Sequence, residues 1–214
     1  MIDHLVVATP DVAATAAYFA DEWGVDLAPG GSHVGRGTRN ELTGLGGARY
    51  LEVVGPDEMQ PVPSHPRPFG VDDLRAPALV AWCARPTRPL PEVIASCRAL
   101  GIDLGNASPM ARRRPDGVLL QWHLTVPLLG PPHEGAVPFL IDWLDSPHPS
   151  ASLPHHCALV ALRLRHPQAD LLTAVLGEIG DALVVEVATG DAELGATVRT
   201  PHGLRDLEHV GLTR

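Results

Sequence analysis

Residues 2–8 form a short run of mainly apolar, partly β-branched residues, a pattern that predicts a β-strand. From Val12 to Trp23 the apolar residues recur at helical spacing instead. Asp11 precedes this segment as a candidate N-cap, and Gly24 follows it in the position expected of a C′ glycine. The pattern therefore predicts a strand followed by a helix.

The segments after this helix predict three further strands. Residues 30–42 are rich in glycine and polar residues, which suits a loop that leads into a short strand. Residues 48–54 are again apolar and end at a Gly-Pro-Asp turn. Residues 1–57 are thus predicted to form a first βαβββ module, and the proline-rich residues 58–77 a linker.

The same order then returns. Residues 79–84 read as a strand, and residues 89–100 read as a helix with apolar residues on one face. Gly101 closes this helix as Gly24 closes the first, which gives an offset of 77 residues between the two copies. An internal repeat of this kind outweighs the assignment of any single element.

The rest of the second copy is a hairpin and a final strand. Residues 108–114 and 118–126 flank the turn signal Pro115-Asp116-Gly117, and residues 137–144 form the last apolar run. Residues 78–150 are therefore predicted to be a second βαβββ module.

A third, shorter copy occupies residues 151–214. A strand is expected at 157–165, a helix at 168–177, and strands at 182–188 and 195–200. No further strand is evident after these. The fold class predicted is α+β, with paired βαβββ modules that form a curled mixed-sheet cup and a C-terminal βαββ half-module.

Composition and charge narrow the classes of function that the chain can have. The 214 residues are 45% hydrophobic and carry a formal net charge of −9, so the chain is globular and a poor candidate for binding nucleic acid. No apolar run is long enough for a membrane span, and residue 2 already begins a strand. The three cysteines, Cys83, Cys97 and Cys157, are odd in number and widely spaced, which favours free thiols and a cytoplasmic protein.

Strand parity brings two chemical groups together. If Leu5 and Val7 face the helix of their module, His4 faces the opposite side, and the same argument for Leu51 sends Glu52 there. The uncovered faces of two modules can curl into a shared cup, so this imidazole and this carboxylate are expected to point into one space. A charge within an apolar strand is costly unless it is paired, which favours a site role for Glu52.

These residues resemble a known family. Ile2-Asp3-His4-Leu5-Val6-Val7 before a helix, followed by Tyr50-Leu51-Glu52-Val53-Val54-Gly55, is similar to the vicinal oxygen chelate superfamily. The stretch with His33, Gly37-Thr38 and Asn40 narrows the resemblance to its glyoxalase-like branch, of the glyoxalase, bleomycin-resistance and dihydroxybiphenyl dioxygenase type. The resemblance is good over residues 1–57 and moderate over residues 78–150.

The resemblance implies a divalent metal such as Zn, Ni, Mn or Fe, held by the first and last strands of each module. His4 and Glu52 match two of the four positions. The 77-residue offset places Ala81 opposite His4, and Ala81 cannot bind a metal.

The second-module counterpart of Glu52 depends on the phase of the last strand. It is Ile141 in one alignment and Asp142 after a shift of one residue. Asp142 is the third metal ligand that we expect, and His123 on the preceding strand is the alternative.

The remaining site residues are expected to bind substrate, with Glu52 as a catalytic group that either ligates the metal or exchanges a proton. Arg112 or Arg114 would hold an anionic substrate group, and the family often places a polar side chain near Asn40 on the substrate. The expected substrate-binding residues are His33, Thr38, Asn40, Trp122, Trp143 and Arg112.

Three functions remain open from the sequence. The first is a glyoxalase-like small-molecule enzyme, such as a metal-dependent lyase, isomerase or dioxygenase acting on a substrate with vicinal oxygen atoms. The second is a metal-free protein that binds or sequesters a small molecule. The third is a scaffold whose degenerate second module serves contacts in a homodimer. His4 and Glu52 favour the first, and the missing second-module ligand favours the other two.

Overall fold

The computed structural model describes residues 1–113, 117–125, 135–180 and 185–208. The hairpin turn expected at Pro115 and Asp116, and Arg114 beside it, lie outside the described residues.

The first module has the expected order of elements. Asp11 caps the helix, since its carboxylate accepts a hydrogen bond from the backbone N–H of Ala14. The last turn widens into a π-helix and ends at Gly24, whose φ of 68° requires a left-handed conformation. The elements are β1 (Ile2–Ala8), α1 (Val12–Tyr18), η1 (Phe19–Trp23), β2 (Ala28–His33), β3 (Thr38–Gly44) and β4 (Tyr50–Pro56).

The second module repeats this order. Its elements are β5 (Ala78–Ala84), α2 (Leu90–Ala99), β6 (Ala107–Arg113), β7 (Leu119–Thr125) and β8 (Phe139–Asp142).

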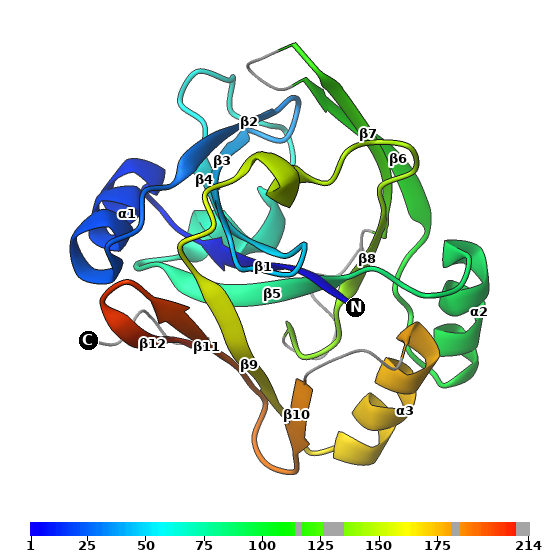
Figure 1. Ribbon diagram of the computed structural model, residues 1–214. Coiled ribbons are helices and arrows are strands. Elements are labelled where there is room, and N and C mark those ends of the chain that lie inside the picture. Colours follow the sequence, from blue (N-terminus) through cyan, green and yellow to red (C-terminus); the bar gives the residue numbers. More distant parts are fainter. Residues whose placement is uncertain (114–116, 126–134, 181–184, 209–214) are drawn as a thin grey trace.

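Both modules join one eight-stranded mixed sheet in the order β2-β3-β4-β1-β5-β8-β7-β6. Within each module the first and last strands run parallel, and β1 and β5 pair antiparallel at the centre. The strand order is symmetric about the central β1–β5 pair, because each module contributes its four strands in the same relative order. A pseudo-twofold repeat produces this symmetry. The predicted fold class is confirmed, and the sheet curls so that its edge strands β2 and β6 approach each other (Figure 1).

Strand alternation sorts the apolar side chains into two clusters. Leu5, Val7, Leu51 and Val53 lie in an outer core, together with side chains of the helices. Val6 belongs instead to an inner core on the concave face of the sheet. This concave face is the cup.

The proline-rich linker does more than connect the modules. Its turn η2 (Pro68–Asp73) places Val71 in the inner core, and Phe69 lies 5.8 Å from the ring of Phe139 on β8. A second short turn, η4 (Pro149–Ser152), leads to Leu153 in the same core. Both connections therefore cover part of the cup.

The C-terminal region forms a second, four-stranded sheet in the order β10-β9-β11-β12. The expected strand, helix and two strands are present, and the chain adds one strand that the sequence pattern did not reveal. The elements are β9 (Ala158–Arg165), α3 (Ala169–Ile179), β10 (Val185–Ala188), β11 (Glu193–Thr200) and β12 (Gly203–Glu208).

This second sheet packs against the outer side of the large one, below β5 in Figure 1. Leu162, Leu194 and Leu207 belong to the same outer core as Leu5 and Trp82. The C-terminal region therefore helps to bury the central strands that carry the cup.

The three cysteines are free and buried. Burial raises the pKa of Cys97 and of Cys157 to about 11. Within the described residues, the helices are too short or too polar to cross a membrane.

The shared outer core predicts that the C-terminal sheet unfolds together with the rest. Leu162 is fully buried, so Leu162→Ala should lower the free energy of unfolding by about 2–5 kcal/mol. Val160 on the same strand is 41% exposed, and Val160→Ala should change it by less than about 0.5 kcal/mol. Urea unfolding followed by circular dichroism should give one transition for all three proteins. An early, separate transition in Leu162→Ala would contradict the shared core.

Candidate active site in the cup

The site begins with an irregularity in β1. Ile2 pairs with Ala84 on β5, and His4 pairs with Cys83, so β1 advances two residues while β5 advances one. Asp3 is the extra residue of this β-bulge, and a bulge changes the direction of a side chain. Ile2 remains in the outer core, whereas Asp3 and His4 both contact groups of the cup.

The carboxylate of Asp3 is fully buried and contacts four groups. Its Oδ1 lies 2.6 Å from Nδ1 of His4. Its Oδ2 lies 2.8 Å from Nε of Arg85, 3.0 Å from Nε1 of Trp143 and 3.0 Å from Nε2 of His148. These groups come from β1, from the end of β5 and from the segment after β8, so Asp3 ties the two modules together.

These contacts keep Asp3 ionised. Burial alone would raise its pKa, but hydrogen bonds from His148 and His4 outweigh burial and lower the pKa of Asp3 well below its ordinary value. An ionised carboxylate only accepts hydrogen bonds. Nδ1 of His4 therefore carries the proton in this pair, and Nε2 of His4 faces the cup.

Glu52 on β4 is the second acidic group of the cup. Its Oε2 lies 3.7 Å from Nε2 of His4, and its Oε1 lies 3.7 Å from Nε2 of His33. Both distances exceed a hydrogen bond. The Nδ2 group of Asn40 donates a hydrogen bond of 2.6 Å to Oε1. One oxygen of Glu52 is thus held by an amide, while the other faces an imidazole.

Asn40 is held in one orientation. Nη1 of Arg112, on β6, donates to Oδ1 of Asn40 at 3.0 Å, so Nδ2 must point toward Glu52 and His33. A Cβ at Gly30 would lie 2.2 Å from Oδ1 of Asn40, which explains a glycine on β2 at this point. Arg112 therefore bridges the two edges of the curled sheet.

His33 fits this network as a neutral imidazole. Burial lowers its pKa, Glu52 opposes this effect, and Arg112 reinforces it. Nε2 of His33 then accepts from Asn40 at 3.3 Å, and Nδ1 donates to the hydroxyl of Thr38 at 3.0 Å.

Aromatic rings surround the polar groups. Tyr50 stacks on His4 with ring centroids 4.5 Å apart, and Phe139 meets His4 edge-on at 5.4 Å. Trp122 and Trp143 lie 5.3 Å apart on the second module. Such walls exclude water and strengthen the electrostatic interactions between the groups that they enclose.

A family model described as a glyoxalase-like domain matches residues 2–180. The chain belongs to this glyoxalase-like family. Its fold is that of the vicinal oxygen chelate type, as the resemblance of β1 and β4 implied. No curated protein matches this glyoxalase-like chain significantly.

Several solved structures align with this chain. A hypothetical protein from Staphylococcus aureus aligns with a TM-score of 0.63 at 13% identity, over 89% of this chain and 86% of its own. Methylmalonyl-CoA epimerase from Mycobacterium tuberculosis aligns at 0.42 and 18% identity, over 71% and 91%. A Mn(II)-bound glyoxalase from Novosphingobium aromaticivorans aligns at 0.46 and 12% identity, over 99% and 83%.

One expected ligand of this glyoxalase-like protein lies outside the cup. Asp142 is exposed, and its carboxylate accepts a hydrogen bond from the backbone of Leu144. The expectation that Asp142 is a metal ligand is corrected by the phase of β8. Ile141 and Trp143 occupy the inner core, so the residue between them points away.

The cup does not fit the four-ligand set of the superfamily. His4 and Glu52 supply two positions. In the second module Ala81 is the counterpart of His4, and Phe139 pairs with Cys83 as Glu52 pairs with Val6, so the described residues at the other two positions are apolar and buried. Asn40 already occupies Oε1 of Glu52 and Nε2 of His33. The donor set favours chemistry by the side chains themselves.

A second group of possible ligands is already engaged. Single ligand atoms of Asp3, His4 and Cys83 lie within 4.8 Å of one another, which is compatible with a divalent ion. The carboxylate of Asp3 is already engaged, however, by hydrogen bonds with His4, Trp143 and His148 and by an ion pair with the guanidinium of Arg85. Burial also raises the pKa of the Cys83 thiol well above its ordinary value, which disfavours the thiolate that a metal requires.

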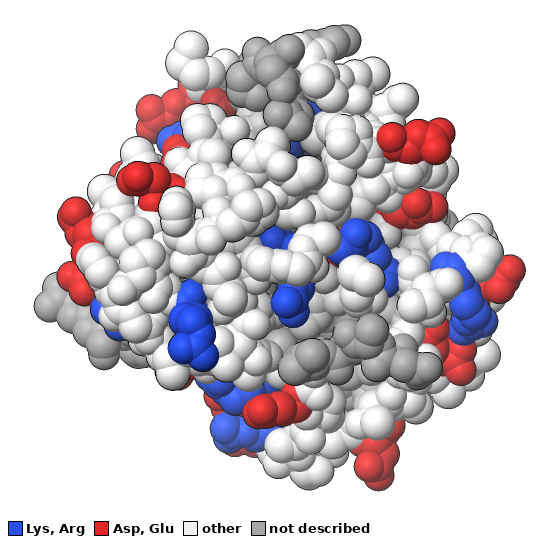
Figure 2. Space-filling view, in the orientation of Figure 1, with Lys and Arg blue, Asp and Glu red and all other residues white. Residues whose placement is uncertain are grey.

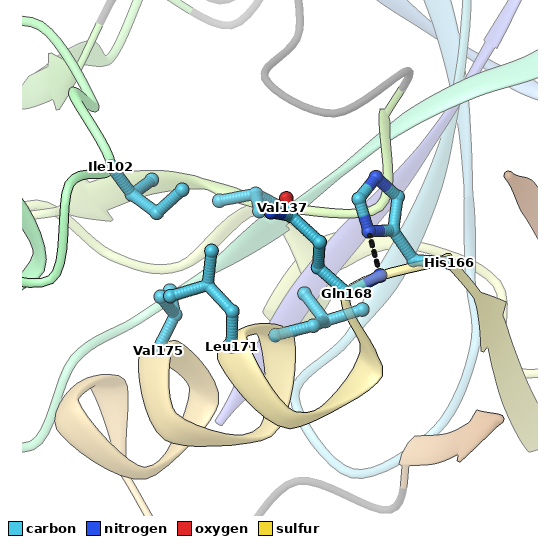
Figure 3. Close-up of a pocket in the computed structure, with 7 residues that line it drawn as sticks. Ile102, Val137, His166, Gln168, Leu171 and Val175 are labelled. Atoms are coloured by element: carbon cyan, nitrogen blue, oxygen red, sulfur yellow. Dashed lines mark hydrogen bonds between the residues drawn. The ribbon is translucent and has the colours of Figure 1, made fainter. Parts of the chain in front are cut away.

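A hollow of about 190 Å³ lies elsewhere, between α3 and the second module. Figure 3 shows Leu171 and Val175 on the helix facing Ile102 and Val137, with His166 and Gln168 at one end. Its lining is mainly apolar. On the face drawn in Figure 2, acidic and basic residues are interspersed.

The structure thus brings together the expected site residues His4, His33, Thr38, Asn40, Glu52, Arg112, Trp122 and Trp143, whereas Asp142 points away. The sequence argument missed Asp3 and His148, because regular alternation places Asp3 on the helix side and His148 lies in a proline-rich connection. The signal for Asp3 was an acidic residue within an apolar strand, directly beside His4. Arg112 was expected to hold a substrate, and its described contact is with Asn40.

Asp3→Asn should destabilise this glyoxalase-like protein by about 3 kcal/mol, because it leaves the donors around residue 3 without a buried charge. The pKa of Asp3 is depressed, so its stabilisation is complete above the ordinary value of 3.8 and is lost as the pH falls below it. The difference in unfolding free energy between wild type and Asp3→Asn should therefore shrink from about pH 5 to about pH 2. Urea unfolding at each pH measures it. Asp73→Asn, at an exposed aspartate, is the control, and a difference independent of pH would refute the argument.

Proposed function

We propose that this protein is a small-molecule enzyme in which Glu52 exchanges a proton with a substrate that carries oxygen atoms on neighbouring carbons. The glyoxalase-like family and its fold support a small-molecule enzyme. The observation that carries the proposal is Glu52 itself, a buried carboxylate with Oε1 held by Asn40 and Oε2 facing His4 at 3.7 Å. A fixed carboxylate within aromatic walls is suited to act as a general base.

The chemistry follows from the positions of the side chains. Glu52 would take a proton from the carbon next to a carbonyl, and the electron pair of that C–H bond would move to the carbonyl oxygen as an enolate forms. Return of the proton to the neighbouring carbon isomerises the substrate, and its return to the same carbon exchanges or inverts that position. Asn40, held by Arg112, keeps Glu52 from rotating.

The test is hydrogen–deuterium exchange. The purified protein is incubated in D2O with a panel of α-hydroxy ketones, α-hydroxy aldehydes and 2-oxo acids, and loss of the C–H signal is followed by proton NMR. Glu52→Gln should slow exchange by about 10²–10⁴-fold, because an amide cannot accept the proton. Glu58→Gln, at an exposed glutamate, should leave the rate unchanged. Equal rates for wild type and Glu52→Gln would refute the role of Glu52.

A metal-dependent lyase, isomerase or dioxygenase is the family's alternative. His4 and Glu52 would hold the ion, and the ion would polarise a substrate oxygen. The apolar Ala81 and Phe139 argue against tight binding, so we expect no stoichiometric binding of zinc, nickel, manganese or iron(II) in calorimetric titrations. One-site binding by wild type that is lost in Glu52→Gln would instead assign Glu52 to a metal site.

A metal-free binding protein is the second candidate, favoured by the paired rings of Trp122 and Trp143. A panel compound that quenches tryptophan fluorescence in a saturable way without any exchange would support it. The three free, buried thiols support a reducing compartment such as the cytoplasm.

A further inference from the structure

We propose that Asp3 is a positioning residue that holds His4 as the Nδ1-protonated tautomer, so that Nε2 of His4 moves a proton between the two oxygen atoms of the substrate. The chemical part of this inference rests on the proposed function, since it adds a second proton-exchanging group to Glu52. The tautomer itself does not depend on any substrate.

The contacts of Asp3 place a proton on Nδ1 of His4. Oδ2 of Asp3 accepts from the indole N–H of Trp143 and lies 2.8 Å from the guanidinium of Arg85, so the carboxylate is an acceptor and Nδ1 of His4, at 2.6 Å, donates to it. His148 shows the opposite arrangement. Its Nδ1 accepts from the backbone N–H of Ser150, and its Nε2 therefore donates to Asp3. The two imidazoles thus present different nitrogen atoms to one carboxylate.

The consequence lies on the other side of the His4 ring. In the neutral imidazole that we propose, Nε2 carries a lone pair that faces Oε2 of Glu52 at 3.7 Å. Two acceptors that face each other repel unless a donor joins them. Tyr50 stacks on one face of the ring and prevents His4 from turning away. The gap between His4 and Glu52 is therefore complementary to a substrate group that carries a proton.

This arrangement divides the proton transfers of an α-hydroxy ketone. Glu52 takes the proton from carbon, and the electron pair of the broken C–H bond generates an enediolate. Nε2 of His4 takes the proton of the hydroxyl oxygen and returns it to the neighbouring oxygen. Glu52 then gives its proton to the second carbon. The carbonyl and the hydroxyl have exchanged places, and both side chains are back in their starting states.

The test of the tautomer is NMR spectroscopy of protein labelled with ¹⁵N-histidine, with the His4 signals assigned by their loss in His4→Gln. In wild type we expect a protonated Nδ1 and an unprotonated Nε2. Asp3→Asn should populate the Nε2-protonated tautomer. His148→Gln removes another partner of Asp3 but leaves the bond to His4, so it should keep the wild-type tautomer.

A protonated Nε2 with a bare Nδ1 in wild type would overturn the proposal, and this result can be obtained even if Asp3→Asn fails to fold. If Asp3→Asn folds and keeps the wild-type tautomer, Asp3 is not the positioning residue.

The exchange assay separates this inference from the proposed function. With an active compound of the panel, Asp3→Asn should slow isomerisation about 10–100-fold, as expected for a partner that orients an active group. His4→Gln should block isomerisation, because the oxygen-to-oxygen transfer is lost. Isomerisation that persists in His4→Gln but is lost in Glu52→Gln would overturn the role of His4 and leave the proposed function standing.

Discussion

The buried carboxylate of Asp3 is the interaction on which the site depends. Taking a charge out of water costs several kcal/mol unless hydrogen bonds and opposite charge replace the solvent. Three hydrogen bonds, with His4, Trp143 and His148, and the positive charge of Arg85 supply that replacement here. Arg85 and Trp143 both contact one oxygen of Asp3, which fixes the register between β1 and the second module. Asp3 in turn orients the ring of His4.

A second bridge closes the opposite side of the sheet. Arg112 on β6 of the second module donates a hydrogen bond to Asn40 on β3 of the first module, and Asn40 donates to Glu52. The glycine at position 30 makes room for this contact. Two polar networks, one through Asp3 and one through Arg112, therefore approach the same pair of groups, His4 and Glu52, from different sides. Each network contains residues of both modules. The second module therefore contributes to the site although Ala81 replaces a metal ligand there.

Much of the fold was accessible from the sequence. Apolar periodicity and the glycines that end the helices revealed both modules, and strand parity sent His4 and Glu52 to one face. The phase of β8 stayed open between Ile141 and Asp142, since the adjacent apolar residues Leu140 and Ile141 could each face the helix side. The proline-rich segment 58–77 was predicted to be a linker, but Phe69 and Val71 pack into the cup. Composition alone does not reveal which surface a loop without periodicity will contact.

The sequence by itself determined the order of the elements, the face on which each regular strand carries its apolar residues, and the chemical groups available to the cup. These are local properties, set by the two-residue period of a strand and the 3.6-residue period of a helix. Only the tertiary structure decided that Asp3 turns into the cup, that Arg112 holds Asn40, and that β12 extends the C-terminal sheet. The bulge at Asp3 exists because β1 and β5, nearly 80 residues apart in the chain, pair in a shifted register. A register between distant strands is a property of the assembled sheet, and no local pattern encodes it.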